Sequence, residues 1–531
     1  MSAWKPRVKA WLAHWPWAPA LYWHLRGRPD HVGGLRLAQV RRRLPEWTEA
    51  VAAHTRASRP PKGKRLLIVA PLHLWLAHAV PMGLTLAAMG HDVHLAYWPY
   101  RDWFTPLDPF ALRQQDAYAW HVLQKARPWL RPISLVRTRP APVPSTWEPW
   151  IEHVTQIDAR YTLMREDVPA EARIVAFRRA RNRSAAGVLR AVMTRLQPDR
   201  VLVPNGLVLE FGVAYHVARA LGIPVTTYEF GPEPERIWLD PEEPVVYLNT
   251  RALWAAWRDR PWPPGAREKI QALFDEVWNA RAGQYAARRW QNVPMQGADT
   301  VRQQLHLDER PVVLLAPNVF GDSVMLDHAI FSQGMADWLR RTLRFLAERP
   351  QVQVVIRVHP SEKHLPPKAL RVTEVVREVL PTLPEHMRLV EAEDPVNTTD
   401  LVRLAIGTLV YASTVGLEAA LLGRPAIVAA RAYYRGHGFT WDPESWDAYW
   451  RVLETLLQEP ETLRPSPAQV EDAWKFAYAF FFHWLRPFPW PLPGMAQHWD
   501  RWPLAQVLGH EGERFRATFE ALAGAPIRWT D

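Results

Sequence analysis

The feature that most constrains the fold is an alternation of short apolar runs with helical segments, which occurs twice along the chain. In the first half, the buried-strand run 64–70 precedes a helix over 80–89 and a strand over 92–97. In the second half, the run 311–316 opens the same pattern. Strands that alternate with helices form parallel sheets with helices on both faces. The sequence therefore predicts an α/β protein with two Rossmann-like domains.

Further elements follow in each half. After the first strand we expect a loop that carries His73 and His78, and residues 105–195 and 250–300 are expected to be mainly helical. The first half is completed by strands 198–204 and 225–229 around a helix over 211–221. In the second half we expect strands 352–357, 387–390, 409–412 and 426–429, and helices 333–349, 399–406 and 416–422.

A chain of 531 residues is too long for one ordinary hydrophobic core. We expect four segments: a basic aromatic extension over 1–62, an N-terminal Rossmann-like domain over 63–300, a C-terminal Rossmann-like domain over 301–465 and a helical tail over 466–531. The aromatic helix predicted over 470–485 either crosses back to the first domain or packs on its own domain.

The net charge of +11 is concentrated at the N-terminus, where residues 1–62 hold twelve Lys/Arg and three acidic residues. The rest of the chain is close to neutral, which argues against a globally basic nucleic-acid-binding protein. The extension also carries interfacial aromatic residues: Trp4, Trp11, Trp15, Trp17, Tyr22 and Trp23. This mixture is typical of contact with an anionic membrane surface. The alternative is a helical extension packed on the body with its charges solvated.

Several classes of site are excluded or not indicated. The chain has no cysteine, which excludes disulfides, zinc-thiolate sites and a thiol nucleophile. No apolar stretch suffices for a membrane span and the start does not resemble a signal peptide, so we expect a cytoplasmic protein whose extension would hold it at the inner membrane face. No Asp-x-Asp pair and no trusted histidine spacing is found, so we expect neither a metal nor a cofactor.

The first motif that indicates chemistry follows an apolar strand. Arg357 and His359 stand directly before Pro360, in the stretch 357–362. The guanidinium of an arginine offers a fork of donors that suits phosphate. A histidine at a strand end can donate to a phosphate oxygen or a ribose hydroxyl. The motif predicts a phosphate or nucleotide contact.

The second motif lies where a strand ends and a helix begins. Ser413 and Thr414 provide hydroxyls, Gly416 would permit close approach of a ligand, and Glu418 lies in the first helical turn, where it could hold ribose hydroxyls. Hydroxyls and backbone N–H groups at a helix N-terminus suit a diphosphate. The alternative is an ordinary N-cap with a favourably placed acid. With the first motif upstream, the interpretation as a phosphate or nucleotide site is favoured.

The first half offers a candidate base. Asn205 follows a strand, and Glu229 ends the next one, where ligands collect in open α/β sheets. We expect Glu229 to act as general base, with His73, His78 and Asp322 as competitors. Asn205, Asn318 and Tyr434 are further candidates for the cleft.

Residues 310–440 resemble the capsule and surface-polysaccharide glycosyltransferase group. The resemblance is most specific in IRVHPSE and YASTVGLEAALLGRPAIVAARAYYRGHGFTWD, with a weaker likeness in VLVPNGLVLEFGVAYHVARALGIPVTTYEFG. Members have the GT-B fold, and the group is related to bacterial Kdo- and sialyltransferases. The resemblance implies metal-independent transfer of a sugar from a nucleotide donor to a capsule, surface-polysaccharide or lipid-linked acceptor. In related sialyltransferases an acidic pair before a glycine supplies the base, whereas only Glu229 precedes Gly231 here.

The resemblance also implies that 63–300 is the acceptor domain and 301–465 the nucleotide-sugar donor domain, and it implies roles for the C-terminal motifs. Arg357 and His359 would contact the donor phosphate or nucleotide, and Ser413, Thr414 and Glu418 would complete that site. Three alternatives share the fold or the motifs: a polyol-phosphate transferase of wall polymers, a sugar-nucleotide 2-epimerase and a catalytically inactive scaffold of polysaccharide assembly. The missing second acid favours the scaffold, and an epimerase would need several carboxylates in the cleft.

Overall fold

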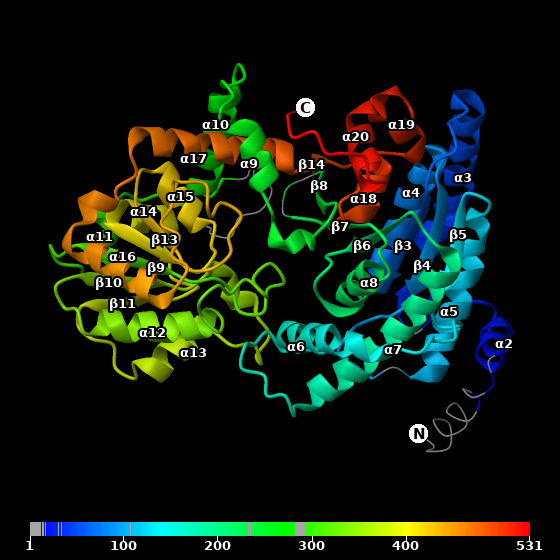
Figure 1. The fold of residues 1–531 in the computed structure, drawn as a ribbon, viewed down its shortest axis with the longest axis horizontal. Coiled ribbons are helices and arrows are strands. Elements are labelled where there is room, and N and C mark those ends of the chain that lie inside the picture. The colour runs from blue at the N-terminus through cyan, green and yellow to red at the C-terminus, as the bar shows by residue number, and fades with distance from the viewer. Residues whose placement is uncertain are drawn as a thin grey trace.

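The computed structural model contains two large sheets, one mainly parallel and one wholly parallel, and each is the centre of one domain (Figure 1). The structure describes residues 12, 15, 17–29, 31, 32, 34–106, 108–231, 233, 235–281 and 293–530. The strands of both domains are apolar runs buried on both faces, as expected for parallel sheets covered by helices. Both domains are Rossmann-like, which confirms the predicted fold class.

The N-terminal sheet has the strand order β14-β8-β7-β6-β3-β4-β5. Its five parallel strands are β3 (Arg65–Pro71), β4 (Asp92–Trp98), β5 (Leu130–Ser134), β6 (Arg200–Pro204) and β7 (Val225–Glu229). β8 (Arg236–Asp240) and β14 (Arg486–Pro487) extend the sheet in antiparallel pairing. The helices are α4 (His73–Ala88), α5 (Pro109–Leu123), α6 (Glu148–Leu163), α7 (Arg173–Leu196) and α8 (Leu209–Ala220). The strand order reverses between β3 and β6, which is the switch point where such sheets bind ligands.

The C-terminal sheet has the order β11-β10-β9-β12-β13, and all its pairs are parallel. Its strands are β9 (Val312–Ala316), β10 (Gln353–Arg357), β11 (Met387–Val390), β12 (Gly407–Val410) and β13 (Ala426–Val428). Its helices are α12 (Met335–Ala347), α13 (Val372–Val379), α14 (Thr398–Leu404), α15 (Val415–Leu421) and α16 (Trp446–Gln458). The switch point of this sheet lies between β9 and β12.

The connector and the tail join the two domains. The connector contains α9 (Arg251–Trp257), α10 (Ala266–Trp278) and α11 (Ala298–Gln304). The tail helix α17 (Pro467–Ala479) packs against α9, α10 and α15 and continues into a π-helical turn at Phe480–Trp484. The chain then crosses to the N-terminal sheet through β14, and α18 (Met495–Arg501), α19 (Leu504–Leu508) and α20 (Glu513–Leu522) lie beside that domain (Figure 1). The tail therefore packs on its own domain and also crosses back to the first domain, which are the two alternatives that the sequence left open.

The N-terminal extension is packed on the first domain where it is described. Helix α3 (Ala38–Ser58) contacts α4 and α19, and helix α2 (Ala18–Leu25) lies against α5. A short hairpin of β1 (His31–Val32) and β2 (Leu35–Arg36) separates the two helices. The expected interfacial residues Trp4 and Trp11 lie outside the described residues. Within the described part of the chain, no helix is both long and apolar enough to cross a membrane.

Two sequence predictions in the first domain are wrong in detail. Helix α4 begins at His73 rather than at residue 80, so His73 and His78 lie on a helix and not in a loop. The helix runs through Pro81, because burial of residues 75–88 outweighs the unfavourable proline. Strand β5 lies within the region 105–195 that was expected to be mainly helical. Its run contains Pro132 and is exposed at Arg131, which hides the apolar pattern of an edge strand.

Candidate active site

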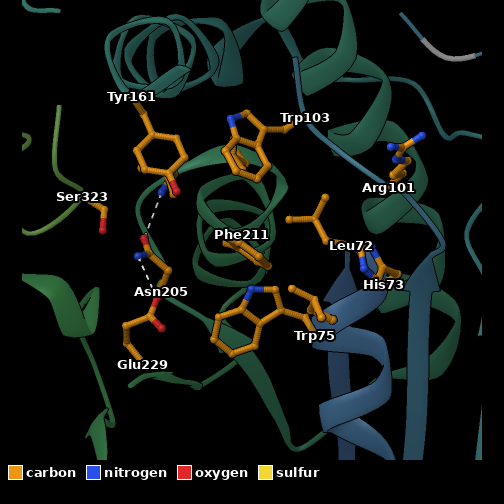
Figure 2. A pocket seen from close by; sticks show the side chains of 13 residues that line it. Leu72, His73, Trp75, Arg101, Trp103, Tyr161, Asn205, Phe211, Glu229 and Ser323 are labelled. Carbon is orange, nitrogen blue, oxygen red and sulfur yellow. Dashed lines mark hydrogen bonds between the residues drawn. The ribbon is translucent and has the colours of Figure 1, made fainter. Parts of the chain in front are cut away.

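A pocket opens at the switch point of the N-terminal sheet (Figure 2). Its cavity of about 250 Å³ is at the small end of ligand pockets, which suits a single sugar ring. The residues that line it come from the ends of β3, β4, β6 and β7, from α4, α6 and α8, and from the loop after β9 of the other domain. They are Leu72, His73, Leu74, Trp75, Arg101, Trp103, Tyr161, Asn205, Val208, Leu209, Phe211, Glu229 and Ser323.

Glu229 is the carboxylate of this pocket. Its Oε2 accepts a hydrogen bond from Asn205 Nδ2 at 3.2 Å (Figure 2). Its Oε1 accepts from the backbone N–H of Phe230 at 3.0 Å. Burial raises the pKa of Glu229 to about 7, against the opposing effect of these two donors, and the charge of Asp322 raises it further. A carboxylate whose pKa lies near neutrality is suited to general base catalysis.

The walls of the pocket are aromatic. Trp75 stacks on Phe230 with ring centroids 5.9 Å apart and meets Phe211 edge-to-face at 5.7 Å. Trp103 and Tyr161 lie across from them, 5.6 Å apart (Figure 2). Large aromatic faces with a few polar groups are typical of small-ligand sites. The combination suits a ligand with apolar faces and hydroxyl edges, such as a sugar.

Left-handed backbone also gathers at the pocket. Leu72, Asn205 and Leu209 line it with φ of +74°, +60° and +57°, respectively. The conformation is unfavourable for leucine, and such residues cluster at functional sites. Asn205 tolerates it well, since its Oδ1 accepts from the backbone N–H groups of Leu207 and Val208 at 3.1 and 3.2 Å. The resulting turn directs Nδ2 of Asn205 toward Glu229.

The backbone of Leu209 is hydrogen-bonded to a network of buried charged side chains. Asp158 on α6 accepts from the backbone N–H of Leu209 and from Arg178 Nη2 at 3.1 Å, and both charged side chains are fully buried. Asn182 donates to the same carboxylate at 2.6 Å. Glu210 pairs with Arg178 at 3.5 Å. These polar groups, distant in sequence, fix one wall of the pocket.

The C-terminal domain contributes Ser323 and Asp322 to the same region. Ser323 lines the pocket, and the charge of Asp322 acts on both Glu229 and Tyr161. The side chain of Asp322 is exposed to solvent, but much of its surroundings is protein. This partial desolvation raises the pKa of its carboxyl group. Two sequence candidates from different domains, Glu229 and Asp322, are therefore brought together.

The other candidates from the C-terminal half gather at the carboxyl ends of its strands. Asn318 follows β9, and its Oδ1 accepts from the backbone N–H of Ala412 at 3.1 Å, which bridges the switch point. Arg357 ends β10, and its Nη1 donates to the carbonyl oxygen of Glu391 at 2.5 Å. Burial lowers the pKa of Arg357 to about 10, so the guanidinium stays charged at neutral pH.

His359 is held in one orientation by the residue two positions on. Its Nδ1 accepts from the backbone N–H of Ser361 at 3.2 Å and lies 2.6 Å from the Ser361 hydroxyl. Burial and the charge of Arg357 lower the pKa of His359 to about 4, so the ring is neutral at physiological pH. Because Nδ1 is the acceptor, the proton lies on Nε2, which makes this nitrogen the donor.

The helix α15 motif differs from the prediction in two respects. The space beside the Cα of Gly416 is taken by Tyr434, because a Cβ there would lie 2.3 Å from the Tyr434 hydroxyl oxygen. Tyr434 is fully buried and donates to the carbonyl oxygen of Ser413 at 2.5 Å. The glycine thus accommodates Tyr434, and Tyr434 does not face a cleft. Thr414 is exposed at the start of the helix.

Glu418 is buried against the connector. Its Oε2 accepts from Trp278 Nε1 at 3.1 Å, and burial raises its pKa to about 7. The contact holds α15 to α10, while the expected role of Glu418 toward a ribose stays a prediction.

His78 does not belong to the pocket, contrary to expectation. It is fully buried, its Nε2 lies 3.0 Å from the carbonyl oxygen of Trp490, and its ring packs between Phe230 and Phe488. Burial lowers its pKa to about 4. Its role is to join α4 to the tail.

Within the described ranges, no group of three or more His, Asp or Glu side chains is arranged to hold a metal ion.

An interdomain clasp, formed by residues 164–166 between α6 and α7, fastens the two domains. The Glu166 carboxylate accepts from the backbone N–H groups of Met335 and Ala336 at 3.0 and 2.8 Å, at the start of α12. Gly321 and Gly334 have positive φ, and a Cβ on either would overlap the clasp. The glycines therefore leave room for the clasp, and the carboxylate compensates the N-terminal dipole of α12.

Replacing Glu166 with Ala is expected to loosen this contact. The variant loses two hydrogen bonds at a helix N-terminus, a change that costs about 1 kcal/mol of local stability. Hydrogen–deuterium exchange of peptides covering 333–340 should accelerate. Glu171, which is exposed on the same connection, provides the control, and its alanine variant should leave the exchange unchanged. Equal protection in Glu166→Ala would contradict the clasp.

Sequence reasoning missed most of the pocket wall. Trp75, Tyr161 and Phe211 are helical aromatic residues, which a sequence pattern cannot distinguish from core residues. Arg101 and Trp103 carried a usable signal, because they directly follow the carboxyl end of β4. Polar and aromatic residues at that position of a parallel sheet are candidates for a binding site.

Two Rossmann-like domains with a pocket where they meet define a protein of the GT-B architecture. Residues 274–462 match the family described as capsule polysaccharide biosynthesis protein. The match covers the end of the connector and most of the C-terminal domain, and it confirms the resemblance there. It includes β9 through β13 and every C-terminal site candidate, and of the residues that line the pocket it includes Ser323 alone.

Comparison with solved structures gives weak likenesses. The beta Kdo 2,4 transferase of Thermosulfurimonas dismutans KpsC is 18% identical, with 52% of this chain and 78% of that chain covered and a TM-score of 0.35. The beta Kdo 2,7 transferase of the same KpsC is 14% identical, with 54% of this chain and 78% of that chain covered and a TM-score of 0.31. The complex of S. aureus MnaA with UDP is 12% identical, with 79% of this chain and 95% of that chain covered and a TM-score of 0.29. No curated protein sequence matches. Because these TM-scores are low, the fold assignment rests on the sheet topology.

Proposed function

We propose that the protein is a glycosyltransferase of capsule or surface-polysaccharide assembly that takes its sugar from a nucleotide donor. The observation that carries the proposal is the pairing, in one chain, of two sites at the carboxyl ends of parallel strands. One is a sugar-sized aromatic pocket with the Glu229 carboxylate. The other holds Arg357 and a neutral His359 within a segment that matches the capsule family.

In the proposed reaction the N-terminal pocket binds the acceptor and the C-terminal strand ends bind the donor. Glu229 removes the proton from an acceptor hydroxyl, and the hydroxyl oxygen forms a bond to the anomeric carbon of the donor sugar. The bond from that carbon to the phosphate oxygen breaks, and the electron pair leaves with the nucleotide. The Arg357 guanidinium and the Nε2 proton of His359 stabilise the charge that develops on the phosphate. Ser413 and Thr414 add hydroxyl donors.

A thermal-shift panel of CMP-, UDP-, GDP- and CDP-linked donors tests the proposal. One nucleotide class should raise the melting temperature, because a ligand that binds only the folded state stabilises it. A response to CDP-linked polyols alone would favour the polyol-phosphate transferase. No response to any nucleotide would favour the scaffold.

Replacing His359 with Ala is expected to weaken donor binding. The variant loses one donor to the phosphate, a charge-assisted hydrogen bond worth about 1.5–3 kcal/mol, or roughly a tenfold to hundredfold change in Kd. Isothermal titration of the stabilising nucleotide measures the change. His364→Ala, on the same loop, is the control. An unchanged Kd in His359→Ala would remove His359 from the donor site.

A further inference from the structure

We propose that the outer face of helix α2 docks on an anionic lipid bilayer. The exposed side chains Trp17, Leu21 and Leu25 form this face, which we call the α2 stripe. The bilayer contact stands independently of catalysis, whereas delivery of a lipid-linked acceptor to the pocket rests on the proposed function.

The α2 stripe is continuous along the helix. Its three residues follow one another at intervals of four positions, which places them on one side of an α-helix. Trp17 is 56% exposed, Leu21 46% and Leu25 77%. Trp15 packs edge-to-face on Trp17 at 5.5 Å and is itself 45% exposed. Contiguous exposed apolar side chains of this size mark an interaction surface.

The opposite side of α2 is fixed to the protein, so the stripe is held facing outward. Trp23 is 2% exposed and packs against Tyr118 and His121 of α5 at 5.8 and 5.5 Å. Ala18 and Pro19 are buried on the same side. Turning the stripe inward would expose the indole of Trp23. The helix therefore presents its apolar side as a built feature of the domain.

The charge beside the stripe selects an anionic surface. Arg26 and Arg28 follow Leu25 directly, and both are exposed. Residues 1–62 hold twelve Lys/Arg against three acids. Exposed Trp and Leu flanked by Arg suit the boundary between headgroups and acyl chains, and each basic residue near anionic lipid adds attraction. A protein partner would need no such excess of positive charge, so the bilayer is the occupant that the face favours.

The extension reaches the pocket through its hairpin. Gly34 lies against Arg101, because a Cβ on Gly34 would be 2.9 Å from Arg101 Cδ, and Arg101 lines the pocket. Two exposed apolar side chains lie at the same end: Leu74 lines the pocket and is 52% exposed, and Phe104, beside Trp103, is 54% exposed. The hairpin that follows α2 therefore connects the extension to the wall of the pocket.

Vesicle co-sedimentation of the full chain tests the proposal. The wild-type protein should sediment with phosphatidylcholine vesicles that contain phosphatidylglycerol, bind pure phosphatidylcholine weakly and lose binding as salt rises. The triple variant Trp17→Glu, Leu21→Glu and Leu25→Glu should bind anionic vesicles about tenfold more weakly or less, because it replaces apolar contact with negative charge. Arg26→Glu with Arg28→Glu should weaken binding as well.

Ile330→Glu is the matched control, since Ile330 is an exposed apolar residue of the C-terminal domain. This variant should bind vesicles like the wild type. Circular dichroism and nucleotide titration should be unchanged in the triple variant, which separates vesicle binding from the proposed function. Failure of the wild type to sediment, equal binding of neutral vesicles, or undiminished binding of the triple variant would overturn the proposal.

Discussion

Replacing Glu229 with Gln is expected to reduce sugar transfer by about a hundredfold to ten-thousandfold, the range attributed to general acid–base catalysis. The amide has nearly the size of the carboxylate but cannot accept the acceptor's proton. Nucleotide affinity should be unchanged, because the donor residues lie in the other domain. Initial rates of transfer, with titration of the nucleotide, measure both quantities. A fully active variant would rule out Glu229 as the base.

The pH dependence distinguishes a base from a positioning residue. Burial raises the pKa of Glu229 to about 7, and only its deprotonated form can take a proton. The rate should therefore rise with pH through about 7 and then level off. A second variant, Asp322→Asn, keeps Glu229 but removes a negative charge that raises the pKa of Glu229. In this variant the increase of the rate with pH should occur at lower pH. An unmoved profile in Asp322→Asn would contradict the coupling.

Replacing Asp158 with Ala is expected to lower the free energy of unfolding of the N-terminal domain by about 3 kcal/mol, the lower end of the cost of removing one partner from a buried ion pair, because Arg178 keeps the more distant carboxylate of Glu210. Arg178 is fully buried, and it loses its nearest carboxylate in this variant. The backbone N–H of Leu209 loses its acceptor as well. Because Leu209 lines the pocket, acceptor KM should rise together with the loss of stability. Chemical denaturation and steady-state kinetics measure the two effects.

The exposed pair of Arg165 and Asp167 provides the comparison for Asp158. Its atoms lie 2.9 Å apart on the surface, and Asp167→Ala should cost less than about 1 kcal/mol. Replacing Asp158 and Arg178 together with Leu should be less destabilising than Asp158→Ala, since no unpaired charge remains. An Asp158→Ala variant as stable as Asp167→Ala would contradict the account of this wall.

The predictable part of the fold is the parallel sheets. Strands such as Val225–Glu229 and Met387–Val390 have the predicted bounds, because short segments rich in apolar, β-branched and aromatic residues are typical of strands. Helix α4 and strand β5 were misjudged, because each contains a proline whose local preference is outweighed by packing. The pairing of β14 with β8 joins residues far apart in the sequence and left no local signal.

The candidate site likewise has a part that the sequence predicts and a part that it does not. Glu229, Asn205, Arg357 and His359 could be proposed because each is a polar residue at the end of a strand or just after it. The pocket wall could not, since an aromatic residue on a helix reads as core until the packing is known. Tyr434 and Gly416 show the converse: a motif that suggested a ligand contact is satisfied by packing between the two residues. Their outcome depended on tertiary contact alone.

The most direct test of the central claim is the mass change of the acceptor. The protein is incubated with the nucleotide sugar that stabilises it and with a lipid-linked glycan fraction from the source cells, and the products are analysed by mass spectrometry. The account predicts that the acceptor gains one glycosyl residue while an equal amount of free nucleotide appears, and that Glu229→Gln yields neither. An unchanged acceptor, or one that gains a polyol phosphate, would contradict it.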